Sequence, residues 1–524
     1  MVEGENRQNS GNEGPGGGLK TISVIMFITL FAKLSGLLRN MVFLYLLGTE
    51  TAEAAAFTFA SVLPRTFLDA AFAAAISAGF IPIFNKYLEQ RSREEAFDLA
   101  RSFITFVALI SLAVSFLGFL GAGLVSDIFF AASGDEQLSA LGAGLLRIMI
   151  FTMFFTSVAF ALTGLSQSLG GFYIPSIMSL LSNALILGYM WLFFEGGGVL
   201  GLALAFVAGN LLQVLIFWLP LRRRGFRFRP KFSFRNEGMR QILRLTPLVM
   251  ISSWLFPLTA VINAAIASNY SPTAFVELEY ASAIFLIVTG MFILSVTNVL
   301  FPKLSKEAAR SENRAEFSQT LSTAISGTTF FLLPMTAGIF ILRVPIVRLI
   351  YERGEFGPEA TAQLAYALGI LTLGIIGYGL VSILTRAFFA TQDGKTPMII
   401  TIIAIALNFI VAIIFVNILG LGGPALATTV ALSFAGISLY VIAARKYDIF
   451  DKATALNFAK MGLAAVVMFA VLWLGQPMLE GLHDILNIAI ITIFGIFIYA
   501  ALSWLLRIKE MQMVKSLIFR RKGK

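Results

Sequence analysis

The chain has 524 residues, of which 58% are hydrophobic and 13% are charged, and its net charge is +10. Because soluble proteins carry about 25% charged residues, this composition excludes an ordinary soluble globular protein. The chain has no cysteine, which excludes disulfides, a thiolate metal site and a cysteine nucleophile. The sequence predicts an all-α integral membrane protein, since its apolar runs are too long for barrel strands. No cofactor and no metal are expected.

The first predicted element is a tail at residues 1–19, which is rich in Gly, Asn and Glu and should be disordered. It lacks the basic start and apolar centre of a signal peptide, so we expect the first apolar run to remain in the mature protein. Fourteen apolar runs follow, each long enough to cross a hydrocarbon core of ~30 Å as a helix. They are predicted at 21–47, 53–86, 99–131, 138–168, 172–195, 197–221, 240–268, 273–302, 316–350, 361–391, 396–419, 422–444, 455–477 and 484–507.

The loops between these runs alternate in charge. Arg222, Arg227 and Arg229 follow the sixth run, whereas Glu50 and Asp135 lie in loops of the other set. Because basic loops stay in the cytoplasm, this alternation predicts that both termini are cytoplasmic. The net charge then reflects topology and attraction to anionic membrane lipids, and no nucleic-acid partner is expected. The exceptions to the alternation are Arg343, Arg348 and Arg353 near the far end of the ninth run.

Sequence matches recur along the chain at an offset of about 220 residues. The stretch GLALA at 201–205 is repeated as GPALA at 423–427, and Leu162 and Pro175 have counterparts at the same offset of 222 residues. These repeats predict two pseudo-symmetric lobes of six helices, followed by two additional C-terminal helices. Such duplicated lobes enclose a central site in alternating-access transporters. The predicted boundaries are 20–222 for the first lobe, 223–239 for a basic linker, 240–446 for the second lobe and 447–524 for the last two helices and tail.

Positive charges interrupt the apolar runs of the first lobe. Lys33 and Arg39 lie in the first run, in LFAKLSGLLRNMVF at 30–43. A charge at the centre of a membrane helix costs about 2.5–3.5 kcal/mol, so such residues usually face a protein interior or a wet cavity. An excess of cations in a cavity indicates an anionic cargo, and arginine binds phosphate through two parallel hydrogen bonds. The alternative is that these side chains reach the membrane interface or pair internally.

Two further arginines belong to the same candidate set. Arg65 in the second run can pair with Asp69 one helical turn later, and Arg147 lies early in the fourth run. The second lobe has few charges within its runs, because Glu279 and Arg386 lie near run ends. We therefore expect a lopsided site whose cationic wall belongs to the first lobe.

Several motifs resemble a known family. KLSGLLRN at 33–40, YERGEF at 351–356 and RAFFATQDGKTP at 386–397 are similar to signatures of the MurJ (MviN) lipid II flippases of the MOP exporter superfamily. The resemblance implies a V-shaped fold in the bacterial cytoplasmic membrane and export of an undecaprenyl-pyrophosphate-linked peptidoglycan precursor. It also implies that Arg39 and Lys33 meet the pyrophosphate, and that the last two helices hold the lipid tail.

The chain departs from the family pattern at several positions. Asn40 replaces an aspartate of the first helix, Leu68 and Asp69 replace an arginine pair, and Ala283 replaces an arginine of the eighth helix. Arg65 is a candidate substitute for the missing cations. The candidate substrate-binding residues are Arg39, Lys33, Arg65, Arg147, Asn40 and Asp69.

Other functions remain open from the sequence. An exporter of a different lipid-linked glycan would use the same cationic cavity, whereas a cation-coupled drug exporter would need acidic residues there. A membrane glycosyltransferase needs clustered catalytic carboxylates, which are not found outside the mixed segment YERGEFGPE. A scaffold for cell-wall assembly would tolerate loss of Arg39. Expected partners are the lipid-linked substrate, membrane lipids and cell-wall synthesis proteins.

Overall fold

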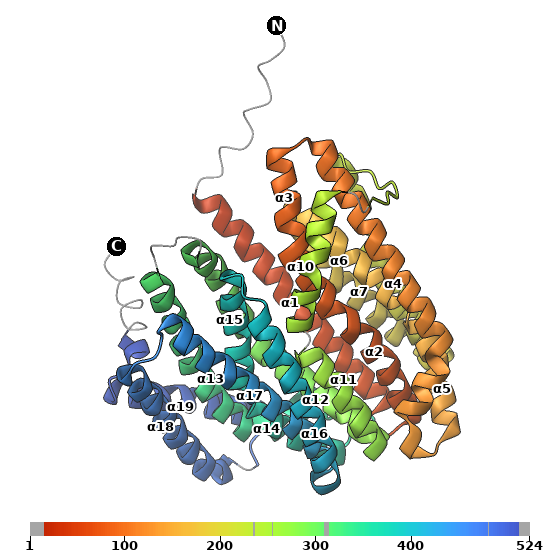
Figure 1. Ribbon diagram of the computed structural model, residues 1–524. Coiled ribbons are helices and arrows are strands. Elements are labelled where there is room, and N and C mark those ends of the chain that lie inside the picture. Colours follow the sequence, from red (N-terminus) through yellow and green to blue (C-terminus); the bar gives the residue numbers. More distant parts are fainter. Residues whose placement is uncertain (1–14, 234–235, 254, 309–313, 480, 513–524) are drawn as a thin grey trace.

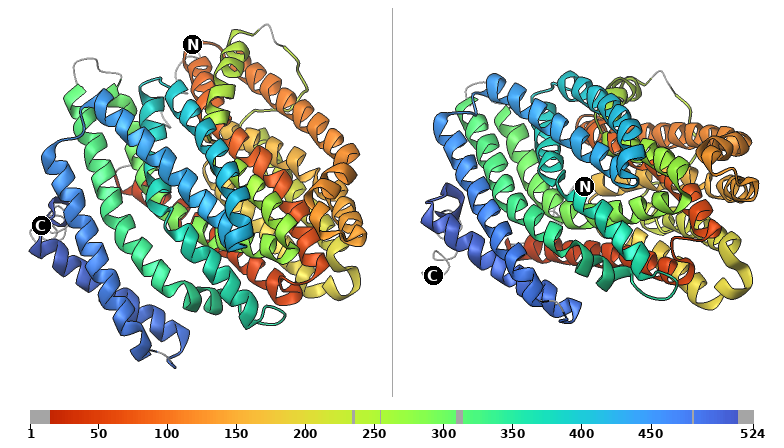
Figure 2. Two further views of the ribbon diagram at one scale, coloured as in Figure 1. Left: turned by 60° about the horizontal axis from the view of Figure 1, so that its bottom comes forward. Right: turned by 90° about the horizontal axis from the view of Figure 1, so that it is seen from below.

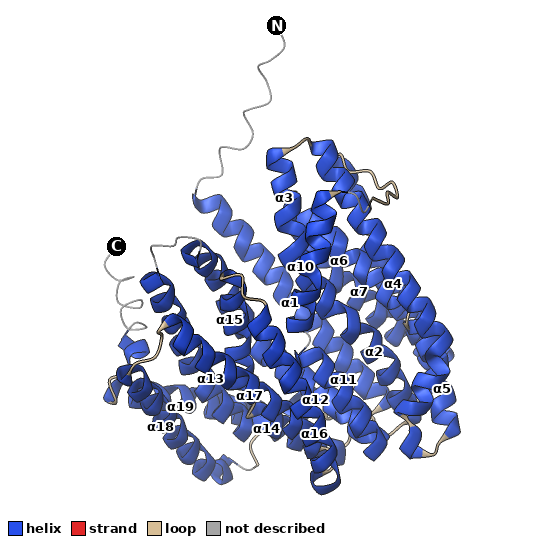
Figure 3. Ribbon diagram, in the orientation of Figure 1, coloured by secondary structure: helices blue, strands red, loops and turns tan. Residues whose placement is uncertain are grey.

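The computed structural model describes residues 15–233, 236–253, 255–308, 314–479 and 481–512, and within these ranges every regular element is a helix (Figure 3). In chain order the elements are α1 (Pro15–Leu47), α2 (Ala52–Ala75), the π-helical turn η1 (Ile76–Phe80), α3 (Ile81–Gln90), α4 (Arg93–Phe129), the 3₁₀ turn η2 (Ala131–Ser133), α5 (Glu136–Met149), α6 (Thr152–Ser168), α7 (Tyr173–Leu192), α8 (Phe194–Leu215), α9 (Trp218–Arg223), α10 (Glu237–Ser253), α11 (Leu255–Tyr270), α12 (Pro272–Ala308), α13 (Arg314–Tyr351), α14 (Pro358–Thr372), α15 (Ile375–Ala390), α16 (Lys395–Leu419), α17 (Gly422–Tyr447), α18 (Lys452–Gly475), the 3₁₀ turn η3 (Gln476–Leu479) and α19 (Asp484–Leu505).

Each predicted apolar run lies on helix, because a backbone in lipid must satisfy its own hydrogen bonds. The boundaries differ in detail. α1 begins at Pro15, so residues 15–19 of the predicted tail are helical, while residues 1–14 lie outside the described residues. Some predicted continuous runs are broken, and the run at 361–391 consists of α14 and α15, bent by 47°.

Eleven of the described helices or helix pairs are long and apolar enough to cross a membrane, and the bent pair α14–α15 brings the number to twelve. The predicted runs at 53–86 and 240–268 are helical but are not among them. Both carry charges, which include Arg65 in α2 and Arg240 in α10. The protein is thus an all-helical membrane protein with eleven to twelve candidate spans.

We call α1–α9 the first half and α10–α19 the second half. Helices α3–α9 lie on one side of the bundle and α13–α19 on the other (Figure 1), while α10 and α11 pack against both α2 of the first half and α16 of the second. The halves meet where α2 packs on α10, α11 and α12, and where α1 contacts α13. The last two helices, α18 and α19, lie at the outer edge of the second half against α13, in all three views (Figures 1 and 2).

The two ends of the bundle differ in charge. The α3–α4 turn and residues 224–233 lie at one end, called the basic end, and the α4–α5 turn lies at the other, called the acidic end (Figure 1). Arg348, one exception to the charge alternation, lies 3.2 Å from Asp484 and 3.6 Å from Glu352. Its charge is therefore balanced locally, and its pairing with Asp484 joins α13 to α19.

Candidate functional site

A cavity of about 320 Å³ lies inside the bundle, walled mainly by α1, α2, α6, α7 and α8 of the first half and by α12 of the second. Its lining combines aromatic and methionine side chains with many polar groups. The polar lining residues are Arg39, Asn40, Thr58, Ser61, Arg65, Thr152, Thr156, Ser179, Ser182, Asn183, Asn210, Gln213, Glu279 and Tyr280.

The half-buried Arg39 of α1 is held in this cavity by neutral groups. Its guanidinium donates to Asn183 Oδ1 at 3.2 Å and to Asn40 Oδ1 at 3.1 Å, and its Cζ lies 5.1 Å from the ring centroid of Phe206. Among the described residues, no carboxylate lies within 4.0 Å of this guanidinium. Arg39 is therefore oriented by dipoles and an aromatic face, and its positive charge is not cancelled by a direct ion pair.

Asn183 itself is fixed in place. Its Nδ2 donates to Ser35 Oγ at 3.0 Å, and the Ser35 hydroxyl donates to the carbonyl of Ala32 at 2.8 Å. Gly36 lies beside Asn183 at this contact, and an added Cβ would make an ordinary contact of 3.6 Å with Asn183 Nδ2. Asn183 and Phe206 were not predicted from the sequence, since an amide and a phenylalanine in apolar runs carry no distinguishing signal.

Arg65 lies in the same cavity but is neutralised. Its guanidinium forms an ion pair with Glu279 of α12, whose side chain is 17% exposed against 50% for that of Arg65. This pair joins the two halves of the chain across the cavity. The position of Glu279 near the end of a predicted run gave no indication of this pairing. The predicted partner Asp69 lies among the side chains outside the described set.

The remaining predicted site residues lie elsewhere. Lys33 is half-buried on α1 but is not part of the cavity lining. Arg147 is exposed on α5, and its guanidinium lies against Gly123 of α4, where an added Cβ would be 3.9 Å away. The structure thus brings Arg39, Asn40 and Arg65 together and separates Lys33 and Arg147 from them.

Aromatic rings close the cavity on the side of the acidic end. Phe43 and Tyr280 have ring centroids 5.9 Å apart, Tyr280 and Tyr351 lie 5.8 Å apart, and Tyr351 and Phe356 lie 5.9 Å apart. All four residues are buried. Since they come from α1, α12, the last residue of α13 and the loop after it, this chain of rings also connects the two halves.

The YERGEF motif forms part of the same closure. The backbone N–H of Glu355 donates to the carbonyl of Tyr45 at 3.1 Å, which seats the loop on the end of α1. Gly354 has φ +58°, and a Cβ there would lie 2.4 Å from the Tyr45 carbonyl oxygen. Only glycine fits this contact without strain, so the motif is explained by close packing between the halves.

The RAFFATQDGKTP motif has a structural role at the basic end. Asp393 accepts hydrogen bonds from the Thr396 N–H at 3.1 Å and hydroxyl at 2.9 Å, and from Lys446 Nζ at 2.6 Å. Burial opposes ionisation of Asp393, but the hydrogen bonds from Lys446 and Thr396 lower its pKa below the ordinary value. The motif thus ties the α15–α16 turn to the end of α17.

A second, apolar groove of about 680 Å³ opens between α13, α18 and α19. Phe330, Leu342, Met468 and Ile491 are among its lining residues, and Gly338 leaves open space in its wall. The groove has almost no polar side chains, so it suits a hydrocarbon chain better than a polar ligand.

A helical membrane bundle with a polar, arginine-containing cavity between its halves defines a membrane transporter. The solved inward-facing structure of a multidrug resistance MATE family transporter of the MOP superfamily shares the fold, with a TM-score of 0.65 at 15% identity over 81% of this chain and 98% of that one. The family model of the lipid II flippase MurJ matches residues 43–494, and the chain belongs to this family of transporters, which are not enzymes.

Individual relatives agree with this assignment. A probable lipid II flippase MurJ of Thermotoga maritima is 27% identical over 92% of this chain and 96% of its own length. The protein of the same name from Vibrio cholerae is 27% identical over 87% of this chain and 89% of its own length. A solved lipid II flippase MurJ in an inward closed conformation has a TM-score of 0.76 at 25% identity, covering 92% of this chain and 98% of that structure.

Proposed function

We propose that this protein moves lipid II, the undecaprenyl-pyrophosphate-linked peptidoglycan precursor, from the inner to the outer leaflet of the bacterial cytoplasmic membrane. Family membership supports the cargo class, and the cavity supports the way it is held. The observation that carries the proposal is the guanidinium of Arg39, which faces the cavity and whose hydrogen-bond partners among the described residues are neutral. A pyrophosphate supplies the negative charge that this position lacks.

The chemistry of Arg39 fits a pyrophosphate. Asn183 and Asn40 each accept one hydrogen bond from it at more than 3.0 Å, so both contacts are replaceable by shorter, charge-assisted bonds to phosphate oxygens. Phe206 covers one face of the guanidinium and leaves its edge for ligands. We place Asn40 as a positioning residue for Arg39, and Lys33 and Arg147 outside the contact with the pyrophosphate.

Transport needs the cavity to change size. A volume of about 320 Å³ is at the lower end of small-molecule pockets, so a disaccharide with an attached peptide does not fit. We propose that the lobes at 20–222 and 240–446 separate on one side of the membrane at a time. The Arg65–Glu279 pair spans this interface, and the pyrophosphate takes the place of Glu279 as partner of Arg65 when the interface opens.

The topology proposed here has fourteen spans with both termini and the basic end in the cytoplasm. The rings of Phe43, Tyr280, Tyr351 and Phe356 then form the outer gate. An inside-negative potential draws the empty, cationic cavity back to the inward-facing state, at about 2.3 kcal/mol per charge per 100 mV. Vesicles without a membrane potential should therefore show slower flipping than polarised vesicles.

The undecaprenyl chain needs a path of its own, because its transfer through a polar cavity would be unfavourable. The apolar groove between α13, α18 and α19 is the proposed path. Its volume of about 680 Å³ exceeds that of the central cavity, and its wall is hydrocarbon. The headgroup crosses between the lobes while the tail stays in this groove or in lipid.

The test is complementation of a bacterium depleted of its own lipid II flippase, with accumulation of lipid-linked precursor as the readout. The wild-type chain should restore growth and remove the accumulated precursor. Arg39→Ala should fail, whereas Arg147→Ala, which removes an exposed arginine of the same half, should succeed. Failure of the well-expressed wild-type chain would favour a different lipid-linked glycan as cargo.

A further inference from the structure

A third hollow lies on the outside of the first half, at the basic end. It has a volume of about 430 Å³ and is bordered by α4, α6, α8, α9 and residues 226–229. It shares no lining residue with the central cavity or with the groove beside α18 and α19. Its floor is apolar, with Val158, Leu162 and Phe217 among the residues that form it.

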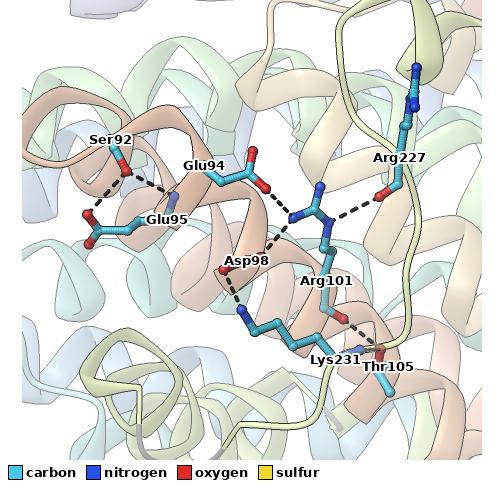
Figure 4. Close-up of polar contacts among 8 residues, drawn as sticks. All are labelled: Ser92, Glu94, Glu95, Asp98, Arg101, Thr105, Arg227 and Lys231. Atoms are coloured by element: carbon cyan, nitrogen blue, oxygen red, sulfur yellow. Dashed lines mark hydrogen bonds and ion pairs between the residues drawn. The ribbon is translucent and has the colours of Figure 1, made fainter.

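The segment that borders this hollow is fixed in place by α4 (Figure 4). Arg101 Nε donates to the carbonyl of Arg227 at 3.1 Å, and the Lys231 N–H donates to Thr105 Oγ1 at 3.2 Å. Lys231 also forms an ion pair with Asp98, and Arg101 lies 2.8 Å from the same carboxylate. These contacts fix the backbone of residues 227–231 against α4.

Three arginines, Arg222, Arg227 and Arg229, stand at the edge of the hollow. All three are exposed, and none of them has an acidic partner within 4.0 Å among the residues that the structure describes. The side chain of Arg227 extends away from the polar cluster of Asp98, Arg101 and Lys231 (Figure 4). Arg101 and Lys231 hold the segment in place, so the charges of Arg222, Arg227 and Arg229 are available to a ligand.

The outer wall of the hollow has the character of a membrane interface. Trp218 is 63% exposed and Leu215 is 55% exposed, although both line the hollow. Tryptophan is enriched where hydrocarbon meets headgroups. An apolar trough with a row of arginines at one edge matches an acyl chain attached to a phosphate, since arginine binds phosphate oxygens through two hydrogen bonds.

We propose that this hollow binds an anionic phospholipid of the surrounding leaflet. One acyl chain lies along Val158, Leu162 and Trp218, and the headgroup phosphate contacts Arg222, Arg227 and Arg229. Such a lipid fastens the linker between the two halves to the membrane. This site does not depend on the cargo of the central cavity, because the two share no lining residue.

The test uses the full chain in lipid nanodiscs that contain a trace of phosphatidylglycerol or phosphatidylcholine with brominated acyl chains, which quench nearby tryptophan fluorescence. Subtracting the signal of Trp218→Phe isolates quenching at Trp218. We expect brominated phosphatidylglycerol to quench Trp218 more than brominated phosphatidylcholine at the same mole fraction. Equal quenching by the two lipids would overturn the proposal.

A matched pair of variants tests the arginines. Arg227→Gln should weaken the preference for phosphatidylglycerol by roughly tenfold, the effect of losing one hydrogen bond to a charged group. Arg223→Gln removes the same charge from an exposed arginine that does not line the hollow, and it should change the preference less than twofold. Equal losses in both variants would show attraction to net charge alone and would also overturn the proposal. Added inorganic phosphate should not displace the lipid, because it lacks the acyl chain.

Discussion

Arg39 and Arg65 lie in the same cavity, yet their positive charges have different partners. Arg65 of α2 forms an ion pair with Glu279 of α12, whereas Arg39 of α1 is held by two amide oxygens and one phenyl ring. An ion pair between two halves that must separate is a contact to be broken. A charge oriented by neutral groups is available to a ligand. We therefore propose that Arg39 is available to the substrate from the start, whereas Arg65 couples the two halves until the interface opens and only then contacts the pyrophosphate.

The largest effect is expected at Arg39. Replacing it by Gln removes the charge but keeps a hydrogen-bonding group, and should slow lipid II flipping in proteoliposomes by about tenfold to a hundredfold, because a hydrogen bond to a charged group contributes about 1.5–3 kcal/mol. Arg39→Lys keeps the charge but lacks the planar guanidinium, so its flipping rate should lie between those of the wild type and Arg39→Gln. Equal flipping rates for Arg39→Gln and Arg147→Gln would contradict a direct contact between Arg39 and the substrate.

A double-mutant cycle sharpens the comparison at Arg65 and Glu279. Glu279→Ala should lower the free energy of unfolding by about 1–2 kcal/mol, discounted because half of the Arg65 side chain is exposed. Adding Arg65→Ala to this variant should cost less than the same substitution in the wild-type chain, because the contact with Glu279 is already absent. Chemical denaturation in mild detergent measures both. Strictly additive losses would mean that the two side chains do not interact.

A substitution in the proposed outer gate tests whether the two halves separate at the acidic end. Gly354→Ala places a Cβ 2.4 Å from the Tyr45 carbonyl at a positive φ, and should disfavour the closed acidic end by about 1–2 kcal/mol. Since the chain has no cysteine, Ser61→Cys reports cavity access cleanly. Labelling of this cysteine by an impermeant maleimide should rise about fivefold. Gly357→Ala, in the same loop with open space around its Cβ, should leave labelling unchanged.

The smallest effect is expected in the apolar groove between α13, α18 and α19, which contains neither Arg39 nor Arg65. Gly338→Phe fills open space in the groove wall and should weaken transport of the full undecaprenyl substrate by about fourfold, the effect of excluding one buried methylene. A short-chain analogue should be transported at the wild-type rate. Gly462→Phe in α18 also faces open space but does not line the groove, and serves as the control.

The positions of the helices followed from the sequence because lipid leaves the backbone few alternatives. Every predicted run lies on helix, but the break between α14 and α15 and the π-helical turn before α3 were not foreseen, since local kinks depend on neighbouring helices. The repeats and the topology derived from loop charges remain predictions. The family motifs were informative about ancestry, and the structure explains two of them, one through close packing of a loop and the other through hydrogen bonds at the α15–α16 turn.

The site was only partly predictable. Arg39 stood out because a charge inside an apolar run is costly, and the structure places it in the cavity. The same reasoning selected Lys33 and Arg147, which lie outside the cavity lining, because sequence spacing does not determine which face of a helix is wet. Glu279 was missed, since its pairing with Arg65 joins residues 214 positions apart.

Solid-state NMR of the protein with bound undecaprenyl pyrophosphate tests the central assignment most directly. Dipolar recoupling between the phosphorus atoms and ¹⁵N-labelled arginine guanidinium groups reports direct contacts, and subtraction of the Arg39→Lys spectrum isolates residue 39. We predict a phosphorus–nitrogen distance of about 3–4 Å for Arg39, as in a hydrogen-bonded arginine–phosphate pair. No recoupling at Arg39 in a sample with bound lipid would contradict the account.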